Sequence, residues 1–315
     1  MTLASPQRPV PAAPTVRRGR RRLAERAIEA LLVLAAIVSI VTTIGIIGSL
    51  LFPTVEFFSK ISLVRFVTET QWTPLFADKH YGVLPLLVAT LWVTLIAIVI
   101  AVPLGLGSAI YLSEYANSGT RKALKPILEI LAGVPTVVYG FFALTALNPL
   151  LRDWWPFGEK PEFQNLLVAG IAMGVMIIPT VASLSEDAMA AVPRSLRAGA
   201  YALASTKMQV STRVVVPAAL SGIVAAVVLG ISRALGETMI VTIAAGLKSG
   251  GMPWDPTTGA ATMTAYIAGA GQGDLPVDSL DYLTIFAVGA TLFVFTFLLN
   301  AFSIRMVRKF REVYE

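Results

Sequence analysis

Long apolar stretches, separated by shorter polar segments, are the main pattern in this chain. A helix that crosses a bilayer needs about 20 mostly apolar residues, because each helical residue advances about 1.5 Å. Three stretches of that length contain no charged residue, and three more contain one or two. The six stretches are 27–52, 82–112, 127–151, 166–185, 218–247 and 282–304. The pattern therefore predicts an all-α membrane protein with six transmembrane helices.

The composition supports this fold class and excludes several functions. Hydrophobic residues make up 56% of the 315 positions and charged residues 14%, whereas a soluble domain carries about 25% charged residues. Cysteine is absent and His80 is the only histidine, so we expect no disulfide and no metal site. The sequence contains no G-x-x-x-x-G-K-[ST] loop for nucleotide phosphates and no hydrolase motif. We expect no catalytic site and no cofactor in this chain, so a transport function would draw its energy from another chain or an ion gradient.

The distribution of Lys and Arg predicts the orientation. Basic residues gather in the loops on the cytoplasmic side of a membrane protein. Alternate segments, beginning with the N-terminal one, hold 18 of the 25 basic residues. These segments are 1–26, 113–126, 186–215 and 305–315. Both termini are therefore predicted to be cytoplasmic. We interpret the Arg- and Pro-rich tail 1–26 as a partly disordered topology signal and not as a nucleic-acid site.

The predicted outer segments are 53–81, 152–165 and 248–281, and they are rich in aromatic residues. Trp and Tyr favour the level of the lipid headgroups. We therefore expect the outer aromatic side chains to be interfacial anchors, and His80 to be a solvated surface residue. The aromatic residues concerned are Phe57, Phe58, Phe66, Trp72, Trp154, Trp155 and Trp254.

Two charges lie near the middle of the fifth span, where an Arg costs about 2.5–3.5 kcal/mol on insertion scales. Arg233 and Glu237 are four residues apart, so a continuous helix places them on one face. They are either a structural ion pair or part of an anion path. In the second interpretation Arg233 contacts an oxyanion through its fork of donors. Ser232 and Thr238 would add hydroxyl contacts.

Proline and glycine interrupt the other spans. Pro135 is predicted to kink the third span, because it removes one backbone hydrogen bond. Thr136 and Tyr139 then either satisfy the freed backbone groups or line a path. Gly170 and Gly174 form a G-x-x-x-G pattern, which is common where transmembrane helices pack together.

The cytoplasmic segment 186–217 is too long for a simple turn. A short helical pattern places Leu196, Ala200 and Leu203 on one face, and Thr206 is positioned to cap a second helix that starts at Lys207. The residue pattern leaves two interpretations open. The loop either docks a cytoplasmic partner or lies on the lipid surface as an amphipathic helix.

This loop resembles the pattern of binding-protein-dependent ABC importers, E-A-A, three residues, G, nine residues, I-x-L-P. Ala198, Gly199 and Ala200 stand at the E-A-A positions, Ala204 at the glycine and Pro217 at the proline. The spacing agrees, although Ala198 and Ala204 replace the family's Glu and Gly. The resemblance implies that the loop docks into a groove on an ATPase subunit.

Three longer strings resemble phosphate-specific permeases of this family, of the PstC type. They are GVLPLLVATLWVTLIAIVIAVPLGLGSAIYLSEYA at 82–116, LKPILEILAGVPTVVYGFFAL at 124–144 and LGISRALGETMIVTIAAG at 229–246. The resemblance implies a type I (MetI-like) core over 82–304. It also implies a homologous PstA-type permease partner, two ATPase subunits that bind ATP and Mg²⁺, and a periplasmic phosphate-binding protein. A self-contained ion-coupled transporter or channel for an oxyanion is the alternative.

Overall fold

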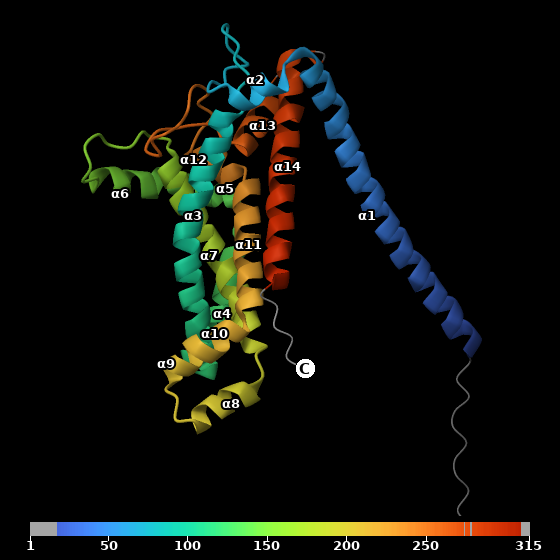
Figure 1. Cartoon of the computed structure of the whole chain (residues 1–315), viewed down its shortest axis with the longest axis vertical. Helices are drawn as coiled ribbons and strands as arrows, with labels where there is room; N and C mark the ends of the chain where they lie inside the picture. Colours follow the sequence, from blue (N-terminus) through green and yellow to red (C-terminus); the bar gives the residue numbers. More distant parts are fainter. Residues whose placement is uncertain (1–17, 274, 278, 310–315) are drawn as a thin grey trace, which may run out of the picture. The chain divides into compact units, whose positions relative to one another are not determined.

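The computed structural model describes residues 18–273, 275–277 and 279–309. The remainder of the two predicted cytoplasmic tails, 1–17 and 310–315, lies outside the described residues. The described secondary structure is helical, apart from isolated β-bridges that join Trp72 to Tyr81 and to Gly250 (Figure 1).

The longer helices are α1 (Arg18–Lys60), α3 (Leu84–Ile110), α4 (Ser118–Ala132), α7 (Leu166–Ala190), α8 (Arg194–Ala202), α11 (Leu220–Gly236), α13 (Met263–Gly271) and α14 (Leu280–Lys309). The shorter helices are α2 (Leu63–Thr68), α5 (Thr136–Phe142), α6 (Asn148–Asp153), α9 (Lys207–Val210), α10 (Val216–Ala218) and α12 (Met239–Ala244). Three π-helical segments are η1 (Tyr111–Tyr115), η2 (Ala143–Leu147) and η3 (Ser211–Val215).

The chain divides into two compact units, Met1–Ser49 and Leu50–Glu315. The first unit contains most of α1, whose most apolar window buries none of its residues within the protein. The second unit contains the helical bundle. The segment 186–217, which we call the coupling loop, contains α8, α9 and most of α10, and these helices lie at one end of the bundle. Helices α2 and α13 lie at the opposite end (Figure 1). We call these the cytoplasmic end and the outer end, after the predicted orientation.

Four helices are long and apolar enough to cross a membrane, and two bent helix pairs bring the total to as many as six among the described residues. The predicted second, fourth and sixth spans correspond to α3 with η1, to α7 and to α14. The predicted third span, 127–151, lies within one bent pair. The predicted fifth span, 218–247, begins at the bend of the second pair and covers α11 and α12. The first pair bends by 87° after α4, and the second bends by 71° between α10 and α11.

The bend in the third span follows from Pro135. In a continuous helix the carbonyl of Leu131 would accept a hydrogen bond from residue 135, but proline has no N–H. That carbonyl accepts from the Val134 N–H at 3.3 Å and from the Tyr139 hydroxyl at 3.0 Å. Tyr139 therefore bonds to the backbone at the break, and a role in lining a path stays a prediction. α5 begins at Thr136, directly after the proline.

The interface between α3 and α7 forms the centre of the bundle. Small residues bring these two helices close together. A Cβ atom on Gly170 would lie 2.7 Å from the Ile96 Cβ, and one on Gly174 would lie 3.0 Å from the Ile100 Cβ. Small residues permit such close contact between transmembrane helices. The G-x-x-x-G pattern therefore lies at a helix interface, as its spacing indicates.

We expect Gly170→Ala to destabilise the protein by about 1–3 kcal/mol, because the added methyl group would overpack this interface. Gly107→Ala on α3 is the matched control, because a Cβ at Gly107 meets nothing within 4 Å. This control should be neutral or stabilising by up to about 1 kcal/mol. Thermal unfolding of the two purified variants in detergent measures the difference, and equal unfolding temperatures would contradict the packing argument.

The outer end contains an aromatic core, which corrects one expectation from the sequence. Phe57, Phe66 and Trp72 are at most 1% exposed, so they are not interfacial anchors. The rings of Phe57 and Phe66 pack edge to face at 5.6 Å, and Trp72 packs against Tyr266 at 4.9 Å. Aromatic pairs in this geometry add to the stabilisation from burial. Phe58 is partly buried against the same cluster, whereas Trp154 and Trp254 remain exposed.

His80 is also not the simple solvated residue that the sequence suggests. Its Nδ1 lies 2.5 Å from the Glu69 carboxylate, and its Nε2 lies 3.2 Å from Asp78. The bonds to Glu69 and then Asp78 raise the pKa of His80 above its usual value. Burial opposes ionisation of Glu69, but bonds from Arg65, His80 and the Tyr81 N–H outweigh it and lower the pKa of that carboxyl. The network joins the segment after α2 to the start of α3.

This network predicts a pH dependence of stability. Because folding raises the pKa of His80, its contribution is fully present below the unfolded value of about 6.5 and is lost as pH rises through the folded value. We expect the unfolding temperature to fall from this source as pH rises above about 6.5. His80→Gln should flatten that part of the profile. Parallel profiles for the two proteins would show that His80 does not contribute.

Candidate translocation path and coupling loop

Arg233 lies in the last turn of α11, half-buried in the bundle. Its Nη1 donates a hydrogen bond to the Thr180 hydroxyl at 3.1 Å. Thr180 lies on α7 directly after Pro179. The last turn of α11 is therefore joined to the proline-containing helix α7 through the Arg233 guanidinium.

The structure corrects the predicted geometry of Glu237. The helix ends at Gly236, and Glu237 has an extended backbone with φ −69° and ψ 130°. The two charged residues therefore do not share one helical face. Glu237 Oε1 instead accepts hydrogen bonds from the backbone N–H groups of Thr238 at 3.2 Å, Met239 at 3.0 Å and Ile240 at 3.4 Å. These N–H groups open α12, so the carboxylate caps the positive end of that helix.

This arrangement leaves Arg233 without an acidic partner. In the described part of the chain, no ion pair joins Arg233 to any carboxylate, and Thr180 is the side chain that it contacts by a hydrogen bond. The interpretation of residues 233 and 237 as a structural ion pair is therefore wrong. A guanidinium has five N–H donors, and Thr180 uses one of them. The remaining donors fit a planar or tetrahedral oxyanion.

The other predicted path residues are placed differently from one another. The Ser232 hydroxyl donates to Asn300 Oδ1 of α14 at 2.8 Å, beside an apolar cavity of about 350 Å³ between α11 and α14. Thr238 lies at the break, and its hydroxyl contacts the Gly236 carbonyl at 3.4 Å. Thr136 is half-buried in the first turn of α5. Whether any of these side chains meets a substrate stays a prediction.

Sequence reasoning missed Thr180 and Asn300 as partners. Both are single polar residues within apolar stretches, and such residues usually find hydrogen-bond partners inside the bundle. Pro179 gave a further signal, because it interrupts the helix next to Thr180. Their particular partners depend on helix packing, which the sequence pattern does not specify.

The loop after α7 forms two short helices, as predicted. Thr206 and Gln209 make a complete capping box at the start of α9, which begins at Lys207. Leu196 and Ala200 of α8 pack inward against a cluster of buried apolar residues at the cytoplasmic end, which includes Ala109, Met189 and Val210. Leu203 does not share their face, because α8 ends at Ala202 and Leu203 is 83% exposed.

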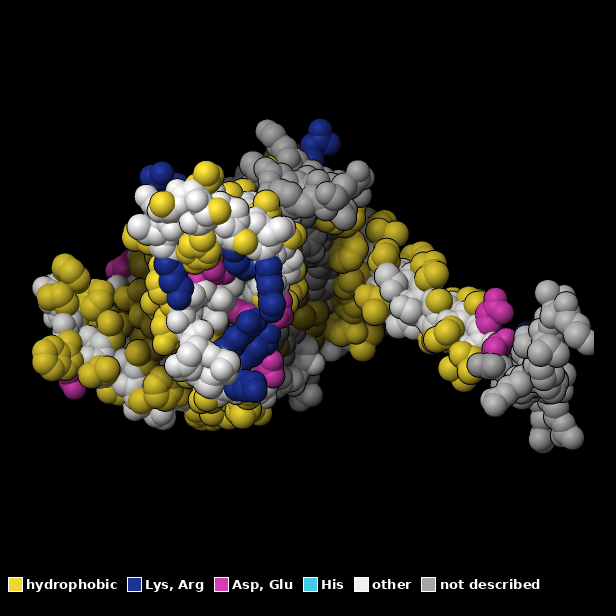
Figure 2. Space-filling view, turned by 90° about the horizontal axis from the view of Figure 1, so that it is seen from below, with side chains coloured by type: hydrophobic (Ala, Val, Ile, Leu, Met, Phe, Trp, Pro, Cys, Tyr) yellow, Lys and Arg dark blue, Asp and Glu magenta, His cyan; other side chains and the backbone are white. Residues whose placement is uncertain are grey.

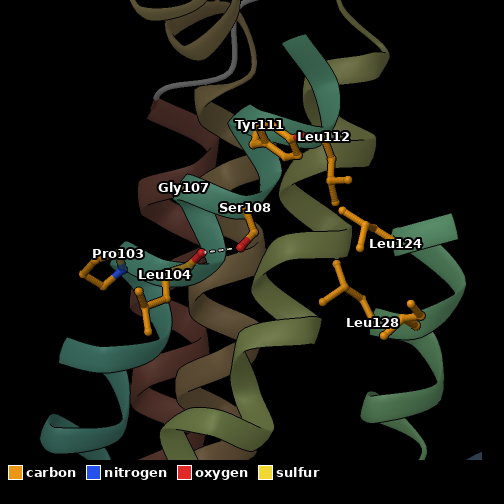
Figure 3. A pocket seen from close by; sticks show the side chains of 9 residues that line it. Pro103, Leu104, Gly107, Ser108, Tyr111, Leu112, Leu124 and Leu128 are labelled. Atoms are coloured by element: carbon orange, nitrogen blue, oxygen red, sulfur yellow. Dashed lines mark hydrogen bonds between the residues drawn. The ribbon is translucent and has the colours of Figure 1, made fainter. Parts of the chain in front are cut away.

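Several residues of the loop project outward, away from the core of the bundle. Ala198, Gly199, Ala204 and Lys207 are exposed, and so is Pro217 in α10 where the chain bends into α11. Lys and Arg side chains gather around a hollow on this end of the protein, with acidic side chains among them (Figure 2). An apolar cavity of about 490 Å³ lies nearby between α3 and α4 and is lined by Leu104, Tyr111 and Leu124 among others (Figure 3).

Ala204 has a left-handed backbone, with φ +59°, between α8 and α9. Such a conformation costs a residue with a side chain about 1–2 kcal/mol, whereas glycine adopts it readily. This is also the position at which the resembling pattern carries glycine. The backbone at this turn therefore keeps the shape for which glycine is suited.

We expect Ala204→Gly to stabilise the loop by up to about 1 kcal/mol, because glycine relieves the strain of the positive φ. Ala202→Gly is the control, since Ala202 ends the helix α8 and should lose about 0.5–1 kcal/mol as glycine. Amide hydrogen exchange of the loop measures both effects. Shifts of the same sign in the two variants would contradict this account.

These features define a polytopic membrane permease subunit, with broken helices around a central cation and a structured cytoplasmic loop. The family model described as "Binding-protein-dependent transport system inner membrane component" matches residues 101–312. The chain belongs to this family.

Two relatives illustrate the similarity. The "Probable ABC transporter permease protein YqgH" of Bacillus subtilis is 38% identical, over 85% of this chain and 84% of the relative. The "Phosphate transport system permease protein PstC 1" of Mycobacterium tuberculosis is 32% identical, over 79% of this chain and 83% of the relative.

Solved structures share the fold. A chain of the bacterial alginate ABC transporter, solved with an alginate-bound periplasmic protein, aligns with a TM-score of 0.64 and 17% identity over 92% of this chain and 96% of its own. A chain of the inward-facing MetNI methionine ABC transporter aligns with a TM-score of 0.53 and 20% identity over 73% of this chain and 95% of its own. The predicted type I importer fold is therefore confirmed.

Proposed function

We propose that this chain is the transmembrane permease subunit of an ATP-driven importer of inorganic phosphate and forms half of its translocation path. The single observation that carries the proposal is the half-buried Arg233, which contacts Thr180 and has no acidic partner among the described residues. The name of the relative from Mycobacterium tuberculosis, a phosphate transport system permease protein, supports phosphate as the anion.

The chemistry of Arg233 suits an anion that must bind and then leave. Its planar donors match phosphate oxygens in pairs. Glu237 would compete with phosphate for these donors, but its carboxylate is held by the first N–H groups of α12. The carboxylate still lowers the positive potential nearby, and conduction requires binding that is favourable but reversible. The pair would thus attract phosphate without trapping it.

The exposed loop supports ATPase subunits as partners. Leu203 is 83% exposed and Met208 68% exposed, on the part of the loop that projects from the bundle (Figure 1). Exposed apolar side chains grouped on one surface favour a protein interface. Because the sequence holds no phosphate-binding loop for a nucleotide, two partner ATPases would bind ATP and Mg²⁺.

Further partners complete the proposed assembly in the bacterial inner membrane. A homologous PstA-type permease would supply the other half of the path. A periplasmic binding protein would deliver phosphate to the outer end, where the segments 53–81 and 248–281 lie. ATP-driven closure of the ATPases would move the loop and reorient the spans.

We expect Arg233→Gln to reduce ATP-dependent uptake of labelled phosphate by at least about tenfold in proteoliposomes, because it removes charge-assisted bonds worth about 1.5–3 kcal/mol. Arg233→Lys should be intermediate, since it keeps the charge and loses the fork. Co-purification of the ATPase subunits checks that each variant still assembles.

Ser232→Ala is the matched control, one residue away with its hydroxyl bound to Asn300. If Ser232→Ala lowers uptake as much as Arg233→Gln, the path does not run along the Thr180 side of α11. Normal uptake by Arg233→Gln would reject the proposed anion contact. Uptake by this chain without ATPase subunits would instead favour the ion-coupled alternative.

A further inference from the structure

The last turn of the α3 span makes two contacts with the cytoplasmic loop. Glu114 and Tyr115 are adjacent at the end of η1, which continues α3. Arg197 of α8 places Nη2 3.0 Å from the Glu114 carboxylate. Lys207 at the start of α9 places Nζ 5.0 Å from the centre of the Tyr115 ring. Both short helices of the loop therefore contact the same turn of one span.

The first of these contacts is shielded from solvent. The Glu114 side chain is 6% exposed and that of Arg197 18% exposed. The Ser113 hydroxyl also donates to the Glu114 carboxylate at 3.0 Å. A shielded charge pair with an additional hydrogen bond holds its geometry more firmly than a solvated surface pair, because neither charge can be rehydrated without opening the contact.

Arg197 also holds the end of α7. It donates to the carbonyls of Met189 at 2.8 Å and Val192 at 2.6 Å, at the end of a helix whose last carbonyls lack partners within the helix. Thr180, which binds Arg233, lies nine residues before Met189 on the same helix, or about 13 Å along its axis. One side chain of α8 thus contacts α3 and the helix that carries the partner of Arg233.

We propose that Arg197 and Lys207 are positioning residues that transmit movement of the coupling loop to α3 and α7. The inference rests on the proposed function, in which the ATPase subunits move this loop. The loop joins the bundle through the non-helical residues 191–193, and a second non-helical stretch, 203–206, separates α8 from α9. Apolar packing of Leu196 and Ala200 also holds α8 against the bundle, but the two polar contacts tie α8 and α9 to one particular turn, so movement of the loop is passed to that turn. The π-helical geometry of η1 is frequent at functional sites.

The test measures phosphate uptake and ATP hydrolysis in the same proteoliposomes, which contain the whole complex. The double variant Glu114→Gln, Tyr115→Leu removes the charge pair and the aromatic face. We expect its ATPase subunits to remain bound and to hydrolyse ATP, while phosphate imported per ATP falls about tenfold. Tyr115→Phe retains the aromatic face and should restore the ratio that Tyr115→Leu loses.

Three outcomes would overturn the inference or the function beneath it. An unchanged ratio in the double variant shows that movement does not pass through η1. Loss of the ATPase subunits shows that this turn serves docking and not transmission. If the unaltered complex shows no ATP-dependent phosphate uptake, the proposed function itself fails.

A second variant keeps the test decisive if the double variant does not assemble. Lys207→Met changes an exposed side chain and removes only the contact with the Tyr115 ring. We expect it to lower phosphate imported per ATP by about twofold, because an exposed cation–π contact is weak. An equal ratio in Lys207→Met and the unaltered complex would overturn the inference.

Discussion

The hydrocarbon interior of a membrane offers no hydrogen-bond partners, and this constraint explains how the broken helices of this protein are built. A freed backbone group within a span must be satisfied by the protein itself. At the bend after α4, the Leu131 carbonyl accepts from the Val134 N–H and also from the Tyr139 hydroxyl. Glu237 accepts from the N–H groups that open α12, and Thr264 donates to the Glu237 carbonyl at 2.6 Å. Each break is therefore accompanied by its own side-chain substitute for the missing helical bond.

The same constraint separates the two central charges. Glu237 satisfies backbone donors at the break, and its carboxylate forms no ion pair with Arg233 among the described residues. Arg233 is then stabilised by the Thr180 hydroxyl and by its place in the bundle interior. A carboxylate bonded to a helix N-terminus and a guanidinium with open donors form a polarised site. An anion entering such a site would displace no bonded carboxylate from the guanidinium.

The sequence predicts those features that depend on local chemistry. Hydropathy locates α3, α7 and α14, Pro135 locates the bend, and the Thr206 cap locates α9. Features that depend on tertiary contacts were missed or predicted wrongly. The spacing of residues 233 and 237 places them on one face of a continuous helix, but the helix ends at Gly236, between them.

The aromatic residues of the outer segments show the same limit. Composition alone does not distinguish a ring at the lipid headgroups from one in a small core. Phe57 and Trp72 are buried because α1, the segment after α2 and α13 converge on them, and this convergence has no local signal. Trp154 and Trp254 have the same amphipathic character and remain exposed.

The two ends of the bundle are held together by different interactions, and this difference suits their proposed roles. At the outer end, aromatic rings pack edge to face around Phe57 and Trp72, and close packing of this kind resists gradual deformation. At the cytoplasmic end, charged side chains join separate helices, as Arg197 joins α8 to the Glu114 turn and Lys125 joins α4 to Glu186. Each ion pair links one side chain to one other, so movement of one helix is transmitted to the helix that carries the partner side chain. Under the proposed function, movement that begins in the loop is therefore passed to α3 and α7. The aromatic core meanwhile holds together the outer ends of α1, α3 and α14.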